Sequence, residues 1–141
     1  MSGINYGRVL MGTLAAGLTA NVCDFITNGF LLAEDMQRMQ QRLNLDPKVV
    51  GGTAVIVTWT AVDFVYAFLI VWTYAAIRPR LGPGPGTAIM AALVPYLAAT
   101  AVLFGFQQMG VFTPDTFLKS SLLSLATAVL AGLAGGYVYS E

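Results

Sequence analysis

Four long apolar blocks constrain this chain more than any other feature. Each is long enough to cross the hydrocarbon core of a bilayer, which takes about 20 residues of α-helix. The blocks occupy residues 9–33, 49–77, 87–109 and 116–139. Only 10% of the residues are charged, against about 25% in soluble domains, so too few charges are present to cover a water-exposed surface. The pattern predicts one all-α, polytopic transmembrane domain over residues 1–141.

The connections between the blocks predict how the helices follow one another. The longest is "EDMQRMQQRLNLDPK", in which Met36, Met39 and Leu43 recur at helical spacing among polar residues. We expect a short amphipathic helix there, at the membrane interface and ended by Pro47. The other two, "RPRLGPGPG" and "GVFTPD", are tight turns. Short connections favour an up-down-up-down bundle of four transmembrane helices.

The turn after the second block carries the expected membrane-interface anchors. Arg78 and Arg80 are placed to meet lipid headgroups, and Trp72 and Tyr74 to join an aromatic belt. A raw count of basic residues favours the opposite side as cytoplasmic. Those residues are interspersed with acids, however, whereas the arginine turn contains none. We therefore expect the arginine turn and both termini on the cytoplasmic side.

A polar stripe interrupts the first block. At 3.6 residues per turn, Asn21, Asp24 and Asn28 fall on one narrow helix face, which Gly17 continues. A carboxylate inside a bilayer costs several kcal/mol unless it is protonated, paired or hydrated. The stripe should therefore face the inside of the bundle rather than lipid.

The second block offers a counterpart, because Trp59, Asp63 and Tyr66 also share a face. Counted from the connection between the two blocks, Asp24 and Asp63 lie at similar depth, so antiparallel helices would bring both carboxyls into one layer. No arginine or lysine lies deep within a block to neutralise them. Either one of the two carboxyls is protonated at neutral pH, and we expect it to be that of Asp24, or a cation occupies the site. In a purely structural interpretation, the stripe supplies hydrogen bonds between helices, each of order 1 kcal/mol.

The fourth block contains a row of small residues at successive i+4 positions, which we call the small-residue row: Ser120, Ser124, Ala128, Gly132 and Gly136. Such a row lets another helix approach closely. The sequence leaves open whether that helix belongs to this chain or to a second protein.

Composition removes several classes of function. The chain has no histidine and one cysteine, and it shows neither a serine–base pair nor a metal-ligand cluster beyond two lone aspartates. We therefore expect no enzyme activity and no cofactor. Seven basic and seven acidic residues balance, which gives no indication of a nucleic-acid partner.

Three hypotheses of function remain. The first is a non-enzymatic subunit that packs against copies of itself or within a larger membrane complex, as the small-residue row suggests. The second is a proton- or cation-coupled transporter or channel for a small solute. Asp24 and Asp63 would titrate, and the site would be lined by Asn21, Asn28, Trp59 and Tyr66. The third is a bundle that binds a pigment, a quinone or a lipid.

Two stretches carry a resemblance: "INYGRVLMGTLAAGLTANVCDFITNGFLL" and "WTYAAIRPRLGPGPGTA". They resemble marker stretches of a group of small bacterial four-helix membrane proteins. This resemblance implies a location in the bacterial inner (cytoplasmic) membrane and says nothing about mechanism. Small multidrug transporters also have four helices and a carboxylate in the first, but their motifs are absent here, so the likeness is a fold-level analogy.

Overall fold

The computed structural model describes residues 3–139, and within these residues the chain is helical with no strand. The elements are α1 (Tyr6–Ile26), a π-helical turn η1 (Thr27–Leu31), α2 (Ala33–Arg42), α3 (Pro47–Val50), α4 (Thr53–Leu81), α5 (Pro85–Gln108) and α6 (Pro114–Tyr139). Four segments are long and apolar enough to cross a membrane: Tyr6–Leu31, Thr53–Leu81, Pro85–Gln108 and Pro114–Tyr139. By length and composition, this is an all-α integral membrane protein, as predicted.

The ends of the helices differ from the predicted ones for local reasons. α1 begins before residue 9 because the side chain of Asn5 accepts a hydrogen bond from the backbone N–H of Arg8 and caps the helix. Pro47 does not end the amphipathic helix α2 but begins α3, where Asp46 provides the cap. α2 already ends at Arg42, and Asn44 then adopts a left-handed conformation with φ 52°.

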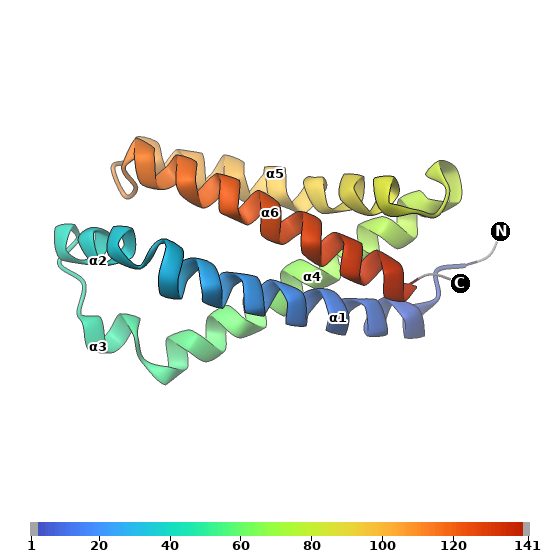
Figure 1. Cartoon of the computed structure of the whole chain (residues 1–141), viewed down its shortest axis with the longest axis horizontal. Helices are drawn as coiled ribbons and strands as arrows, with labels where there is room; N and C mark the ends of the chain where they lie inside the picture. Colours follow the sequence, from blue (N-terminus) through green and yellow to red (C-terminus); the bar gives the residue numbers. More distant parts are fainter. Residues whose placement is uncertain (1–2, 140–141) are drawn as a thin grey trace.

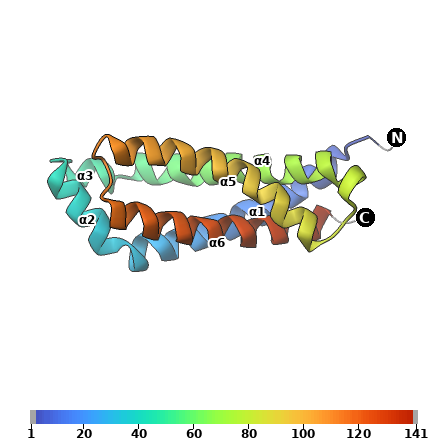
Figure 2. The same ribbon diagram turned by 90° about the horizontal axis from the view of Figure 1, so that it is seen from above.

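The long helices lie side by side along the molecule (Figure 1). α1 packs against α4 and α6, and α5 packs against the same two helices, so α1 and α5 occupy opposite corners. The start of α1, the end of α6 and the α4–α5 turn lie at one end, which we call the terminal end. α2, α3 and the α5–α6 turn lie at the other end, which we call the α2 end (Figure 2).

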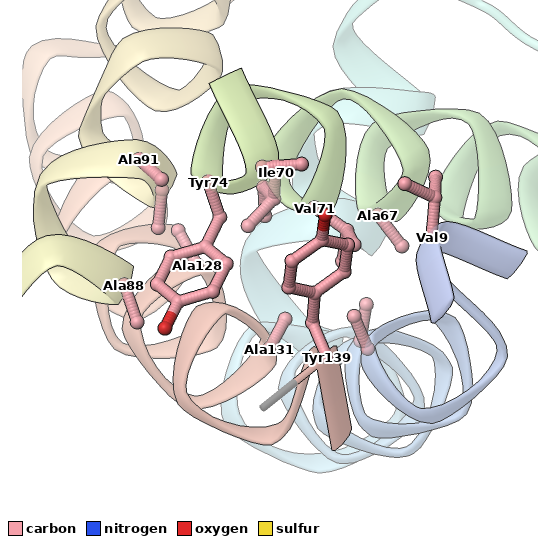
Figure 3. Packing of buried hydrophobic residues seen from close by; sticks show 14 residues of the cluster. Val9, Ala67, Ile70, Val71, Tyr74, Ala88, Ala91, Ala128, Ala131 and Tyr139 are labelled. Carbon is pink, nitrogen blue, oxygen red and sulfur yellow. The ribbon is translucent and has the colours of Figure 1, made fainter. Parts of the chain in front are cut away.

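The tightly packed core occupies the terminal half of the molecule. Its α4 members all lie in the second half of that helix, from Ala67 to Ala75, and its α5 members in the first half, from Thr87 to Pro95. Figure 3 shows Tyr74 and Tyr139 among small side chains from all four long helices. The rings of Tyr74 and Tyr139 meet edge to face, with 5.7 Å between their centroids. Most core side chains are alanines, which lets the helix backbones approach closely.

The small-residue row finds its partner within this chain. A Cβ placed on Gly132 would lie 2.8 Å from the Cβ of Ala92, and one on Gly136 would lie 2.9 Å from the Cβ of Ala88, both on α5. Ala128 is fully buried in the core. The neighbouring Gly135 performs the same role toward α1, where its Cβ would lie 3.0 Å from the Cβ of Ala16. These glycines therefore seat α6 between α5 and α1.

One predicted membrane anchor has a different position. Tyr74 is only 2% exposed and lies inside the bundle, where its hydroxyl accepts a hydrogen bond from the N–H of Gly84. It is a core residue and not part of a lipid-facing belt, so this prediction was wrong. Trp72 is half-buried and packs against Tyr6 and Phe68. The two arginines expected as anchors at the turn also differ in position. Arg80 is exposed, whereas Arg78 is half-buried over the ring of Tyr139.

Candidate intramembrane carboxyl site

Three helices bring Asp24, Asp63 and Thr127 together. Asp24 lies near the end of α1, Asp63 in the middle of α4, and Thr127 in the middle of α6. The carboxyl of Asp24 is within hydrogen-bonding reach of both the carboxyl of Asp63 and the hydroxyl of Thr127. The predicted pairing of Asp24 with Asp63, which we call the carboxyl pair, is therefore present. The hydroxyl of Thr127 is also within hydrogen-bonding reach of the thiol of Cys23.

The phenol groups of Tyr66 and Tyr96 lie near the carboxyl pair. Tyr66, one turn beyond Asp63 on α4, interacts electrostatically with the Asp24 carboxyl and with the phenol of Tyr96 on α5. The hydroxyl of Tyr96 donates to the backbone carbonyl of Ser121 at 3.0 Å, which fixes its position against α6. The carboxyl pair thus lies in a polar layer to which all four long helices contribute.

A cavity of about 530 Å³ reaches Asp24 from the α2 end of the molecule. Asp24, Asn28, Gln40, Ser120 and Ser124 form the polar part of its wall. The remaining lining side chains are apolar: Met36, Met39, Val50, Trp59, Leu103, Phe112 and Phe117. None of these lining residues is basic, so Asp24 is the only ionisable group on the wall.

The cavity exists because α4 diverges from the other helices toward its first residues, which lie below α1 in Figure 1. α4 has no buried residue before Asp63, and all of its buried residues lie between Ala67 and Ala75. Gly17 of α1 lies at the point of divergence, in direct contact with the ring of Phe64. α4 is therefore packed against the other helices in its second half and separated from them in its first half.

The predicted site residues are only partly gathered at this site. Asn28 and Trp59 line the cavity, although Trp59 remains 64% exposed. The amides of Asn21 and Asn28 donate to the carbonyls of Gly17 and Asp24, four residues back in their own helix. The amide donors thus stay on α1 rather than bridging to α4.

Sequence reasoning missed the part of the site that α2, α5 and α6 supply. Thr127 lies in none of the predicted clusters, and Ser124, assigned to helix packing, lines the cavity instead. A signal was available: Ser120, Ser124 and Thr127 are spaced by four and three residues, so they share one polar face of α6. Met36 and Met39 gave a second signal, but their amphipathic pattern indicated a membrane surface as readily as a cavity wall.

The donor atoms near the carboxyl pair are carboxyl, hydroxyl and thiol groups. Within residues 3–139, no set of three or more His, Cys, Asp or Glu side chains is arranged to hold a metal ion. The fold and this layer define a class: a small four-helix integral membrane protein with a carboxyl pair inside the bundle. No family model, no curated protein and no solved structure matches the chain.

Proposed function

We propose that this protein is a proton-coupled transporter of a small organic cation, with Asp24 and Asp63 as the binding and titrating groups. The observation that carries the proposal is the cavity: it reaches Asp24, and none of the side chains on its wall is basic. A purely structural role for the carboxyl pair would instead favour a dry, packed seam between α1 and α4.

The arrangement of the two carboxyls supports binding of one positive charge. Two carboxylates in contact repel each other strongly where water is scarce, so they are stable together only when they share a proton or hold a cation. A proton and an organic cation therefore compete for the same pair. Competition of this kind couples the movement of the proton to that of the cation when the site is exposed in turn to each side of the membrane.

The wall of the cavity favours a cation with apolar substituents. Trp59, Phe112 and Phe117 offer aromatic surface, and Met36 and Met39 offer polarisable thioethers. An aromatic face attracts a desolvated cation by about 0.5–2 kcal/mol. The volume of about 530 Å³ lies within the range of about 300–1,000 Å³ found for small-molecule sites. A monovalent ammonium with one aromatic or branched apolar group fits these properties.

The proposal includes a membrane arrangement. The four long helices cross the bilayer in up-down-up-down order, α2 lies at one interface, and both termini lie on the cytoplasmic side. The bacterial inner membrane is the location that the sequence resemblance implies. In this arrangement the cavity faces the side opposite the termini, because α2 and the α5–α6 turn lie at the other end of the bundle.

The test uses benzyltrimethylammonium as the probe and the purified protein in mild detergent. Calorimetry measures binding, and a pH indicator in weak buffer measures proton release. We expect the wild type to bind the probe and release protons. Asp24→Asn should bind at least about tenfold more weakly, a loss of about 1.4 kcal/mol, and release none. Proteoliposomes with an imposed pH gradient then test for uptake of the probe.

Two controls make the result specific. Asp46→Asn removes an acid outside the cavity and keeps an amide oxygen that can cap α3, so it should behave like the wild type. Neopentylbenzene, which has the shape of the probe without its charge, should release no protons. Equal binding of the probe by the wild type and Asp24→Asn would refute the proposal.

Self-association remains a separate prediction. Its motive was the small-residue row, whose Gly132 and Gly136 pack against α5 of the same chain. The row is therefore no longer an argument for a second copy. Crosslinking in gentle extracts measures the oligomeric state independently of the transport assay.

A further inference from the structure

α2 is held to the α5–α6 turn by polar contacts. The guanidinium of Arg42 donates to the backbone carbonyls of Gly110, at 2.8 Å, and Val111. At the other end of the helix, the carboxylate of Asp35 lies 3.5 Å from Lys119 Nζ, which also contacts Asp115 at 2.7 Å. We call the contact of Arg42 with the two carbonyls the latch.

The geometry of the α5–α6 turn presents those two carbonyls to Arg42. Gly110 has φ 81°, and the N–H groups of Gly110 and Val111 donate back to the carbonyls of Gln107 and Phe106. This is a Schellman motif, which satisfies carbonyls in the last turn of α5. The carbonyls of Gly110 and Val111 themselves point out of the motif and accept from Arg42.

The face of α2 that carries these contacts also covers the cavity. Asp35, Met36, Met39 and Arg42 follow one another at helical spacing. Met36 and Met39, together with Gln40, form part of the cavity wall. Arg38, one turn before Arg42 and about 40° from it around the helix, forms an exposed ion pair with Glu34 of α2 itself. α2 therefore covers part of the α2 end of the cavity.

Both ends of α2 are joints rather than continuous helix. On the α1 side, the π-helical turn η1 and Leu32, with φ −112° and ψ 10°, separate α2 from α1. On the other side, Asn44 has φ 52° before α3 begins. α2 contains no buried residue of its own, so little apolar burial holds it in place. The hydrogen bonds of Arg42 are exposed, and exposed polar contacts are individually weak, which suits a cover that opens and closes.

We infer that α2 is the gate of the cavity, pivoting at its two joints and held closed by the latch. The inference rests on the proposed function, because it describes how a solute reaches the carboxyl pair. Release of Arg42 from the turn lifts Met36 and Met39 away and admits water and solute from that face of the membrane.

The test measures access to the cavity directly. Ser124, on the wall, is replaced by cysteine in a Cys23→Ala chain, so that it carries the sole thiol. Its rate of modification by trimethylammonioethyl methanethiosulfonate then reports how often the gate opens. We expect Arg42→Gln to raise that rate about tenfold, equivalent to about 1.4 kcal/mol in the closing equilibrium. Hydrogen exchange at the amides of residues 33–43 should quicken in the same variant.

The matched control is Arg38→Gln. It removes the same charge from the same helix, but Arg38 pairs with Glu34 within α2 rather than with the α5–α6 turn, so the variant should leave both rates at the wild-type value. Asp35→Asn breaks the second tie and should raise the rates less than Arg42→Gln does. This variant also carries the test if Arg42→Gln fails to fold, as judged by circular dichroism.

The outcomes separate the gate from the transport proposal. Unchanged rates in Arg42→Gln, or equal rises in Arg42→Gln and Arg38→Gln, would overturn the gate even if benzyltrimethylammonium binds. Faster modification in Arg42→Gln alone supports the gate. If the probe then fails to bind Asp24, the proposed function falls and the gate stands.

Discussion

Replacing Gly132 by alanine tests the close packing of α5 against α6. The added Cβ would lie 2.8 Å from the Cβ of Ala92 and 2.9 Å from the carbonyl oxygen of Ala88. Ordinary contacts of this type begin at 3.4 Å. The two helices must therefore separate locally by about 0.6 Å, the difference between 3.4 and 2.8 Å. Neither neighbour is the end of a flexible side chain, so the backbones themselves have to move.

The magnitude follows from a matched variant. Overpacking of this kind costs about 1–3 kcal/mol, while alanine is favoured over glycine within a helix by about 1 kcal/mol. At Gly105, on an open face of α5, an added Cβ would have no atom within 4 Å, so Gly105→Ala gains the helix propensity of alanine without overpacking. Both variants gain this propensity, so it cancels when their free energies of unfolding are compared. Gly132→Ala should therefore unfold more easily than Gly105→Ala by about 1–3 kcal/mol.

The assay is unfolding by sodium dodecyl sulfate in mild detergent, followed by circular dichroism. Both variants are studied at several protein concentrations, because a contact within one chain gives a stability difference that does not depend on concentration. Native mass spectrometry of the same samples shows the number of copies. Equal stabilities of Gly132→Ala and Gly105→Ala, or a difference that grows with protein concentration, would refute the intramolecular packing.

Two further predictions follow from the contacts around the carboxyl pair. Gly17→Ala should destabilise the protein by about 1–3 kcal/mol, because its Cβ would meet the ring of Phe64. Adding Phe64→Leu should restore part of the lost stability in the same unfolding assay. If the losses of the two substitutions simply add, the contact is contradicted. Infrared spectra of the wild type at neutral pH should show the carbonyl stretch of a protonated carboxyl that disappears in Asp24→Asn, because two carboxyls in contact are stable together when they share a proton. A spectrum with ionised carboxylates alone would show that a cation or water stabilises the pair instead.

The sequence determined the features that depend on one helix at a time. Hydropathy alone located four spans, because each must be apolar over its own length whatever its neighbours are. Helical periodicity placed Asp24 and Asp63 on inward faces, because a charged group facing lipid is costly in any arrangement. Equal depth along two antiparallel helices was then sufficient to predict the carboxyl pair.

The tertiary structure decided the features that depend on several helices together. Tyr74 has the sequence position of a membrane anchor, but Gly136 and Ala88 leave room for its ring inside the bundle. Hydropathy cannot distinguish these two places, because lipid and the protein interior are both apolar. The order of the helices around the bundle placed Thr127 beside Asp24, and that order is not written in any one segment.

The cavity and its cover, α2, also depend on several helices together. The cavity depends on the angle at which α4 leaves the bundle, which is set jointly by small residues at one end and by Phe64 against Gly17. The contact of Arg42 with the carbonyls of Gly110 and Val111 joins residues that lie 68 and 69 positions apart. Backbone carbonyls are the same in every residue, so no side-chain pattern in the sequence marks these two as acceptors; only folding brings them within reach of Arg42.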